Sequence, residues 1–88
     1  MTDRDIARRV VWFQEPELTL ANPRMFLSYL MTYGTLDEVQ HIRARLGDDL
    51  FRKTLENPVI GVFDARSWNY WHLFYGKQNV PPLPSRRL

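Results

Sequence analysis

Arg66 and His72 are the two residues whose types could together support catalysis. The two residues stand six positions apart. At about 100° per residue, this spacing puts their side chains on different faces of a straight helix.

The Arg–x(5)–His spacing of Arg66 and His72 resembles the nuclease motif of a helical nucleotide-binding family, and this resemblance implies a minimal ribonuclease in which Arg66 holds the phosphate and His72 assists the 2′-hydroxyl of RNA. Because the two side chains lie on different faces of a straight helix, we expect a protein that is not an enzyme, and we keep ribonuclease activity only as an alternative.

Metal sites and other catalytic groups find little support. His41 and His72 are the only histidines, and neither has another histidine three or four positions away, as a zinc-binding helix would need. Asp48 and Asp49 are adjacent, so on a helix they point apart, and a helix start explains two acids. The chain has no cysteine, which excludes disulfides and thiolate ligands. We expect no metal and no cofactor.

Length and composition bound the class of protein. The 88 residues suffice for one small domain and are too few for a dinucleotide-binding fold or a barrel. A hydrophobic content of 44% indicates that the chain folds. The net charge of +2 is too balanced to imply nucleic-acid binding by itself. No apolar run approaches the roughly 20 residues that cross a bilayer, so we expect no membrane association and a cytoplasmic protein.

Capping residues and apolar spacing predict an all-α fold. The clearest signal is the capping box Thr35-Leu36-Asp37-Glu38, followed by apolar residues three or four positions apart, the face of an amphipathic helix. Asn22-Pro23 and Asp64 predict two more helix starts. We expect four to five short helices in a small compact bundle, within a single domain of residues 1–76. The expected helices span residues 2–9, 23–33, 36–46, 48–56 and 65–75.

Two segments are expected to be extended. Glu15-Pro16 interrupts any helix before it, since the residue before a proline avoids the α conformation. Residues 10–21 therefore read as an extended N-terminal arm, with Trp12 and Phe13 packed against the helix of residues 65–75. Residues 77–88 are proline-rich and then basic, which predicts an extended tail that is mobile in the isolated protein.

The segment of residues 65–75 holds more aromatic side chains than one buried stripe can shelter. Some of them must cover other elements or remain as a contact surface for a protein partner. The proline-rich tail could add to this surface, because a stiff segment loses little entropy when it docks. Spare apolar surface would also permit self-association. The candidate partner-binding residues are Trp68, Tyr70, Trp71, Tyr75, Leu83, Arg86 and Arg87.

Basic residues near an aromatic side chain support a second hypothesis. Arg8 and Arg9 stand beside Trp12, and with Arg86 and Arg87 they could bind nucleic acid. The protein would then be a transcriptional regulator of its own operon. The helical hairpin of residues 35–56 is a poor DNA reader, because its second helix begins with two acids that would meet phosphates.

Several motifs together resemble a family of small uncharacterised prokaryotic helical proteins. They are Trp12-Phe13 before an acid, the capped helix start at 35–38, the stop at Arg45-Leu46-Gly47, and the aromatic segment 67–75. Its most specific part is Asn69-Tyr70-Trp71-x-Leu73, and the likeness covers about residues 11–76. Members are often encoded just upstream of an abortive-infection-type nucleotidyltransferase toxin. The resemblance implies an antitoxin-like protein that binds and restrains such a toxin. It assigns no catalytic residue and does not explain the tail.

Overall fold

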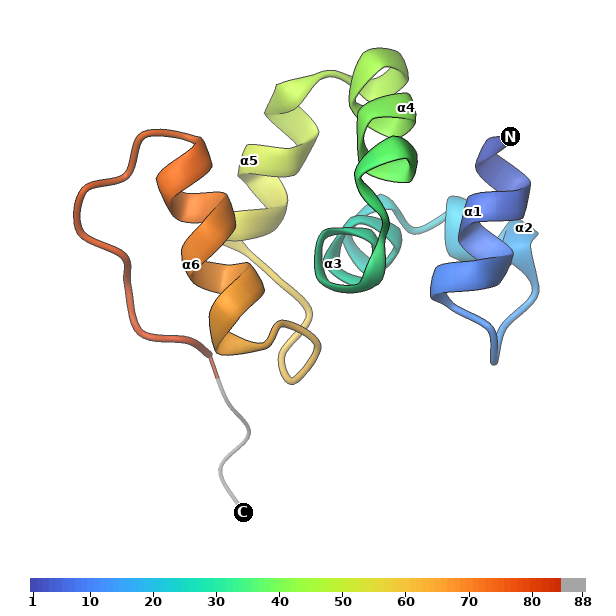
Figure 1. Ribbon diagram of the computed structural model, residues 1–88. Coiled ribbons are helices and arrows are strands. Elements are labelled where there is room, and N and C mark those ends of the chain that lie inside the picture. Colours follow the sequence, from blue (N-terminus) through green and yellow to red (C-terminus); the bar gives the residue numbers. More distant parts are fainter. Residues whose placement is uncertain (85–88) are drawn as a thin grey trace.

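The computed structural model describes residues 1–84, and every regular element in that range is an α-helix (Figure 1). This confirms the all-α prediction. Within residues 1–84 the structure has six helices rather than the expected four to five. The helices are α1 (Asp3–Val10), α2 (Pro16–Leu20), α3 (Pro23–Tyr33), α4 (Leu36–Leu46), α5 (Asp48–Glu56) and α6 (Ala65–Phe74).

Local capping interactions start most of these helices. The Thr35 hydroxyl accepts a hydrogen bond from the Glu38 main-chain N–H at 3.2 Å, and the Glu38 carboxylate accepts one from the Thr35 N–H at 2.8 Å. The expected capping box of α4 is therefore present. The side chains of Asn22 and Asp64 cap α3 and α6 in the simpler one-bond form. These bonds reach only three residues along the chain, so they can be read from the sequence.

The N-terminal arm is the main correction to the predicted fold. Residues 10–21 are not extended: Pro16 ends no helix but begins α2, at the first helical position, where a missing N–H costs no hydrogen bond. Trp12 lies on the turn between α1 and α2, with 73% of its surface exposed. The neighbouring Phe13 is also exposed and meets Tyr29 of α3, at 5.7 Å between ring centroids. Neither residue belongs to the core at α6.

Helix α3 forms the centre of the molecule and packs on each of the other helices (Figure 1). Its apolar residues Phe26, Leu27 and Leu30 are buried, which explains why this helix is hydrophobic nearly all round. Helices α1 and α2 cover one side of α3, and α5 and α6 cover the other. The core therefore continues from α1 to α6 through α3.

A partly buried ion pair joins α1 to the start of α4. The Glu38 side chain is nearly inaccessible, and both of its oxygens accept hydrogen bonds from the Arg9 guanidinium, at 2.6 Å from Nε and closer from Nη2. Arg9 also donates to the Tyr33 carbonyl at 2.9 Å. These hydrogen bonds lower the pKa of Glu38 despite its burial, because they favour the charged carboxylate.

Candidate partner-binding surface

Helix α6 divides its aromatic side chains between the core and the surface. Trp68, Trp71 and His72 form its buried face. Tyr70 and Leu73 are 52% and 61% exposed, and Phe74 beside them is also exposed. Positions 70, 73 and 74 follow the spacing of one helical face, so these three side chains form a continuous stripe. The sequence-based expectation of surplus aromatic surface on this helix is met by Tyr70 and Phe74.

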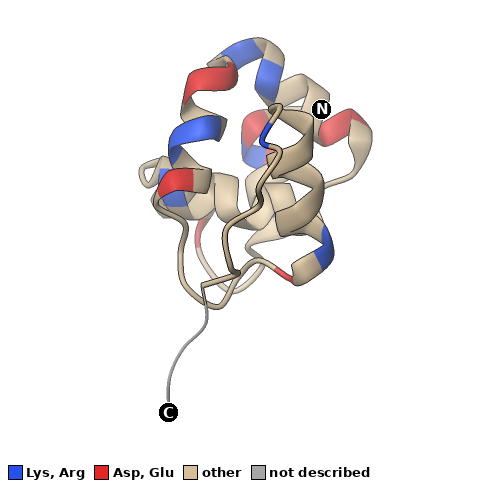
Figure 2. Ribbon diagram, turned by 90° about the vertical axis from the view of Figure 1, so that its left-hand side faces the viewer, with Lys and Arg blue, Asp and Glu red and all other residues tan. Residues whose placement is uncertain are grey.

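The exposed stripe carries no charge of its own. Figure 2 views the molecule from the side of α6 and shows the helix without Lys, Arg, Asp or Glu except near its amino end, where Asp64 and Arg66 lie. Charged residues lie instead on the neighbouring helices α4 and α5. An uncharged apolar stripe bordered by charged elements is typical of the centre of a protein interface.

Trp68 and Trp71 do not belong to that surface, which corrects the prediction for these two residues. They are 3% and 4% exposed. The indole N–H of Trp71 donates to the Met31 carbonyl, and that of Trp68 donates to the Pro81 carbonyl, both at 2.8 Å. Large aromatic rings whose N–H finds a buried acceptor are core residues. They position the exposed side chains of α6 rather than meeting a partner themselves.

Tyr75 joins three helices and is only partly available to a partner. Its hydroxyl donates to Asp48 at 2.9 Å, and the Arg43 side chain donates to the same carboxylate oxygen at 2.9 Å. The Arg52 guanidinium lies over the Tyr75 ring, 5.0 Å from its centroid. Burial, followed by the contact with Asp48, raises the pKa of Tyr75 to about 12. This cluster locks the carboxyl end of α6 onto α4 and α5.

The tail residues among the candidates fall into two groups. Leu83 is partly buried and packs against the core, so it is turned toward this chain. Arg86 and Arg87 lie outside the described residues. The predicted boundary between a domain of residues 1–76 and a tail of residues 77–88 is therefore crossed by apolar contacts, and by the hydrogen bond from Trp68 to Pro81.

A cleft between α4 and α6 extends the exposed stripe. It has a volume of about 470 Å³, and the carboxyl end of α3 contributes to its lining. Tyr70 lines one wall and Leu36, which is largely exposed, lines the other. We name Leu36, Tyr70, Leu73 and Phe74 the α6 surface. Leu36 was missed as a site residue because its spacing matches the buried face of α4, whereas the structure leaves its side chain exposed.

A second aromatic group lies around the turn between α1 and α2. The rings of Trp12 and Phe13, Phe13 and Tyr29, and Tyr29 and Tyr33 follow one another at 5.3, 5.7 and 6.1 Å between centroids. Trp12, Phe13 and Tyr33 are exposed. We name these four residues the turn cluster. The aromatic pair at 12–13 could have indicated this surface from the sequence, had it not been assigned to the core.

The basic residues proposed for nucleic-acid binding are partly occupied within the chain. Arg9 holds the buried Glu38, so its guanidinium is committed to the fold. Arg8 is exposed near Trp12, while Arg86 and Arg87 lie beyond the described range. Of the four arginines in the nucleic-acid hypothesis, Arg8 is therefore the one that lies within the described residues and is not part of the ion pair with Glu38.

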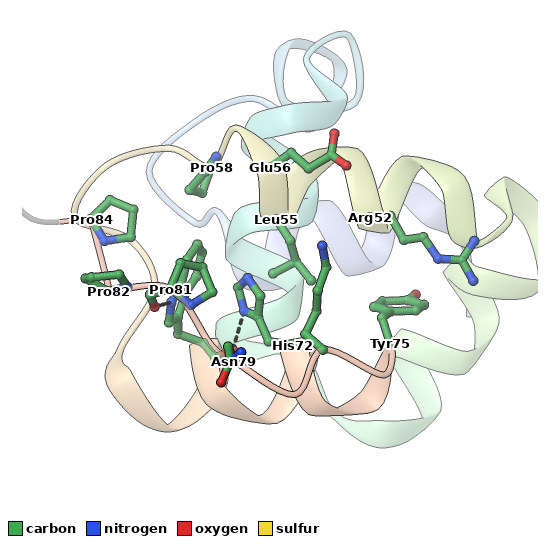
Figure 3. A pocket seen from close by; sticks show the side chains of 12 residues that line it. Arg52, Leu55, Glu56, Pro58, His72, Tyr75, Asn79, Pro81, Pro82 and Pro84 are labelled. Atoms are coloured by element: carbon green, nitrogen blue, oxygen red, sulfur yellow. Dashed lines mark hydrogen bonds between the residues drawn. The ribbon is translucent and has the colours of Figure 1, made fainter.

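Arg66 and His72 are not brought together. His72 is buried, with Nδ1 at 2.8 Å from the Trp68 carbonyl, and it lines a cavity beneath residues 77–84 (Figure 3). Arg66 is exposed and lines the cleft between α4 and α6. Arg66 and His72 therefore line two different cavities, and they do not form one site that could bind a phosphate and a 2′-hydroxyl together.

Among residues 1–84, no group of three or more His, Cys, Asp or Glu side chains is placed to hold a metal ion. None of the helices in this range has the length and apolar character needed to cross a membrane.

Comparison with known protein families, with curated protein sequences and with solved structures finds no match for this chain. The family resemblance carried by residues 11–76 thus stays a prediction.

Proposed function

We propose that the chain is a non-enzymatic, antitoxin-like cytoplasmic protein that binds and restrains a nucleotidyltransferase-type toxin through the α6 surface. The supporting observation is the exposed stripe of Tyr70, Leu73 and Phe74 on a helix whose opposite face is firmly buried. The class of the partner rests on the family resemblance carried by motifs within residues 11–76. Apolar side chains displayed at helical spacing next to a cleft suit the docking of a partner helix.

Rigidity of the α6 surface favours such docking. Phe74 lies under the Arg43 guanidinium, 4.8 Å from its ring centroid, and Tyr70 stacks on Phe74 at 6.0 Å. The cluster at Asp48 and Tyr75 holds the same end of the helix. Side chains that are already ordered lose less conformational entropy on binding, so more of the contact energy appears as affinity. Aromatic residues in such positions are the usual hot spots of protein interfaces.

Two measurements test the proposal. The product of the neighbouring toxin gene should be captured by this protein in a pull-down, and co-expression should rescue growth of cells that express the toxin. Absence of both capture and rescue would remove the proposal.

Surface variants then test the site. We expect the double variant Tyr70→Asp/Leu73→Asp to weaken toxin binding by about 100-fold, since two hot-spot residues are lost. The matched control is Leu18→Asp/Ile60→Asp, which adds the same charges at exposed apolar residues outside α6. The control should change binding by less than about threefold. Equal losses in both variants would place the contact elsewhere.

A further inference from the structure

Residues 77–84 form a strap that runs back along α6 (Figures 1 and 3). The chain turns at Gly76, where a φ of 80° suits glycine, and the Lys77 N–H donates to the His72 carbonyl at 2.9 Å. Beyond this point the strap contains no helix. Val80 and Leu83 are partly buried and pack against the core. A segment expected to be a free tail is therefore docked on its own domain.

The centre of the contact is one indole group. The Trp68 N–H donates to the Pro81 carbonyl at 2.8 Å. The Trp68 ring is held from two sides, by Phe63 at 5.4 Å and by His72 at 4.2 Å between centroids. His72 is held in turn by its hydrogen bond with the Trp68 carbonyl. The donor is thus held by contacts with Phe63 and His72 that do not involve the strap.

A fixed indole donor beside apolar walls is the chemistry that recognises proline-rich segments. A polyproline II helix makes no internal hydrogen bonds, so its carbonyls are free to accept from a partner. Proline rings fix φ near −65° and keep such a segment extended at little entropic cost. Domains that bind proline-rich peptides supply aromatic-lined grooves for them. Residues 80–84 of the strap read Val-Pro-Pro-Leu-Pro, with its first proline carbonyl on Trp68.

We infer that the face of α5 and α6 around Trp68 is a polyproline-recognition groove, which the strap of this chain occupies and from which a proline-rich segment of the same chemistry displaces it in trans. This inference does not depend on the toxin proposal, because it concerns the opposite face of α6 and a different ligand.

The strap is attached lightly enough to exchange. Among residues 78–84, the hydrogen bond from Trp68 to Pro81 is the one that joins the strap to the helices. The remaining attachment is apolar contact through Val80 and Leu83. The strap also leaves space unfilled, because a cavity of about 480 Å³ remains between it and the helices, as Figure 3 shows for the side chains around it. A groove that is only partly filled can accept a competing segment.

The first experiment measures the strap in the full-length chain. Hydrogen exchange of the three indole N–H groups should be slow for Trp68 and Trp71, whose N–H groups are bonded, and fast for the exposed Trp12. In the variant Val80→Asp/Leu83→Asp, we expect Trp68 to exchange at least tenfold faster while Trp71 stays slow. Exchange of Trp68 as fast as that of Trp12 in the unmodified protein would overturn the inference.

The second experiment measures binding in trans. A fluorescent synthetic peptide of residues 77–88 should bind the released full-length variant at least tenfold more tightly than it binds the unmodified protein. Adding Trp68→Phe, which removes the indole donor, should weaken peptide binding by about tenfold. The matched substitution Trp12→Phe should leave it unchanged.

Failure of the released variant to bind the peptide, with Trp71 still slow, would refute the groove. If the aspartates unfold the chain, Trp71 will also exchange fast. Pro81→Gly/Pro82→Gly then replaces them, since it loosens the strap without adding charge. The same two outcomes decide the question with this variant.

Discussion

Replacing Arg9 by Met should destabilise the protein by about 2–3 kcal/mol at pH 7. The substitution keeps the length and apolar part of the side chain but leaves the carboxylate of Glu38, a residue that is 6% exposed, without its charged partner. Removing one partner of a fully buried ion pair costs about 3–5 kcal/mol. We expect a smaller loss because half of the Arg9 side chain is accessible to water and because the Thr35 N–H still donates to Glu38.

The pH dependence of this loss follows from the direction of the pKa shift. The hydrogen bonds from Arg9 lower the pKa of Glu38 from its ordinary value of 4.5. A group with a lowered native pKa stabilises the fold above its ordinary pKa and loses that contribution as pH falls through the lowered value. In the Arg9→Met variant, the part of this contribution that comes from Arg9 is absent. The difference in unfolding free energy between the unmodified protein and the Arg9→Met variant should therefore have its full value near pH 7 and should decrease below about pH 4.5.

Urea unfolding followed by circular dichroism at pH 7 and pH 3 measures both effects. Arg4→Met is the matched control, since it breaks an ion pair with Glu17 in which both side chains are more than half exposed. Such a pair contributes at most about 1 kcal/mol, so the control should change stability little at either pH. A loss below about 0.5 kcal/mol for Arg9→Met at pH 7, or a difference that stays constant down to pH 3, would refute the argument.

Two further substitutions test the cluster at α6 and the junction of α3 with α4. Asp48→Asn should lower the pKa of Tyr75 from about 12 but leave it above 10, because burial, the larger cause of the raised pKa, remains. Absorbance titration of the tyrosines measures this pKa. An unchanged pKa would show that Asp48 has no part in the shift. Gly34→Ala should destabilise the fold by about 1–3 kcal/mol, since the new Cβ would lie 2.5 Å from the Leu30 carbonyl oxygen. Thermal unfolding measures this loss. An unchanged unfolding temperature would mean that the turn relaxes freely around the new Cβ.

Local signals predicted the helices with one exception. The Thr35 capping box and the Asn22 and Asp64 caps act within three residues, so the predicted starts of α3, α4 and α6 were correct. Helix α2 was missed because a proline carries two opposite meanings. It interrupts a helix that precedes it and suits the first position of a helix that follows it, and the five-residue α2 has too little apolar periodicity to decide between them.

The candidate site was only partly visible in the sequence. Tyr70 was identified together with Trp68 and Trp71, because their residue types are equally suited to a contact surface. Their separation into exposed and buried groups depends on acceptors far along the chain, since the Trp71 indole meets Met31 and the Trp68 indole meets Pro81. Leu36 has an apolar spacing that predicts burial, whereas the structure leaves it largely exposed on the wall of the cleft between α4 and α6.

The amino-acid sequence alone determined that this protein is helical, where most of its helices begin and end, and that its aromatic content near residue 70 exceeds one buried stripe. The tertiary structure decided which rings face outward, that Trp12 and Phe13 lie on a turn rather than in the core, and that the proline-rich segment lies on Trp68. The reason is physical. Helix caps depend on neighbours three residues away, whereas burial depends on which distant elements pack together, and that is established only when the whole chain folds.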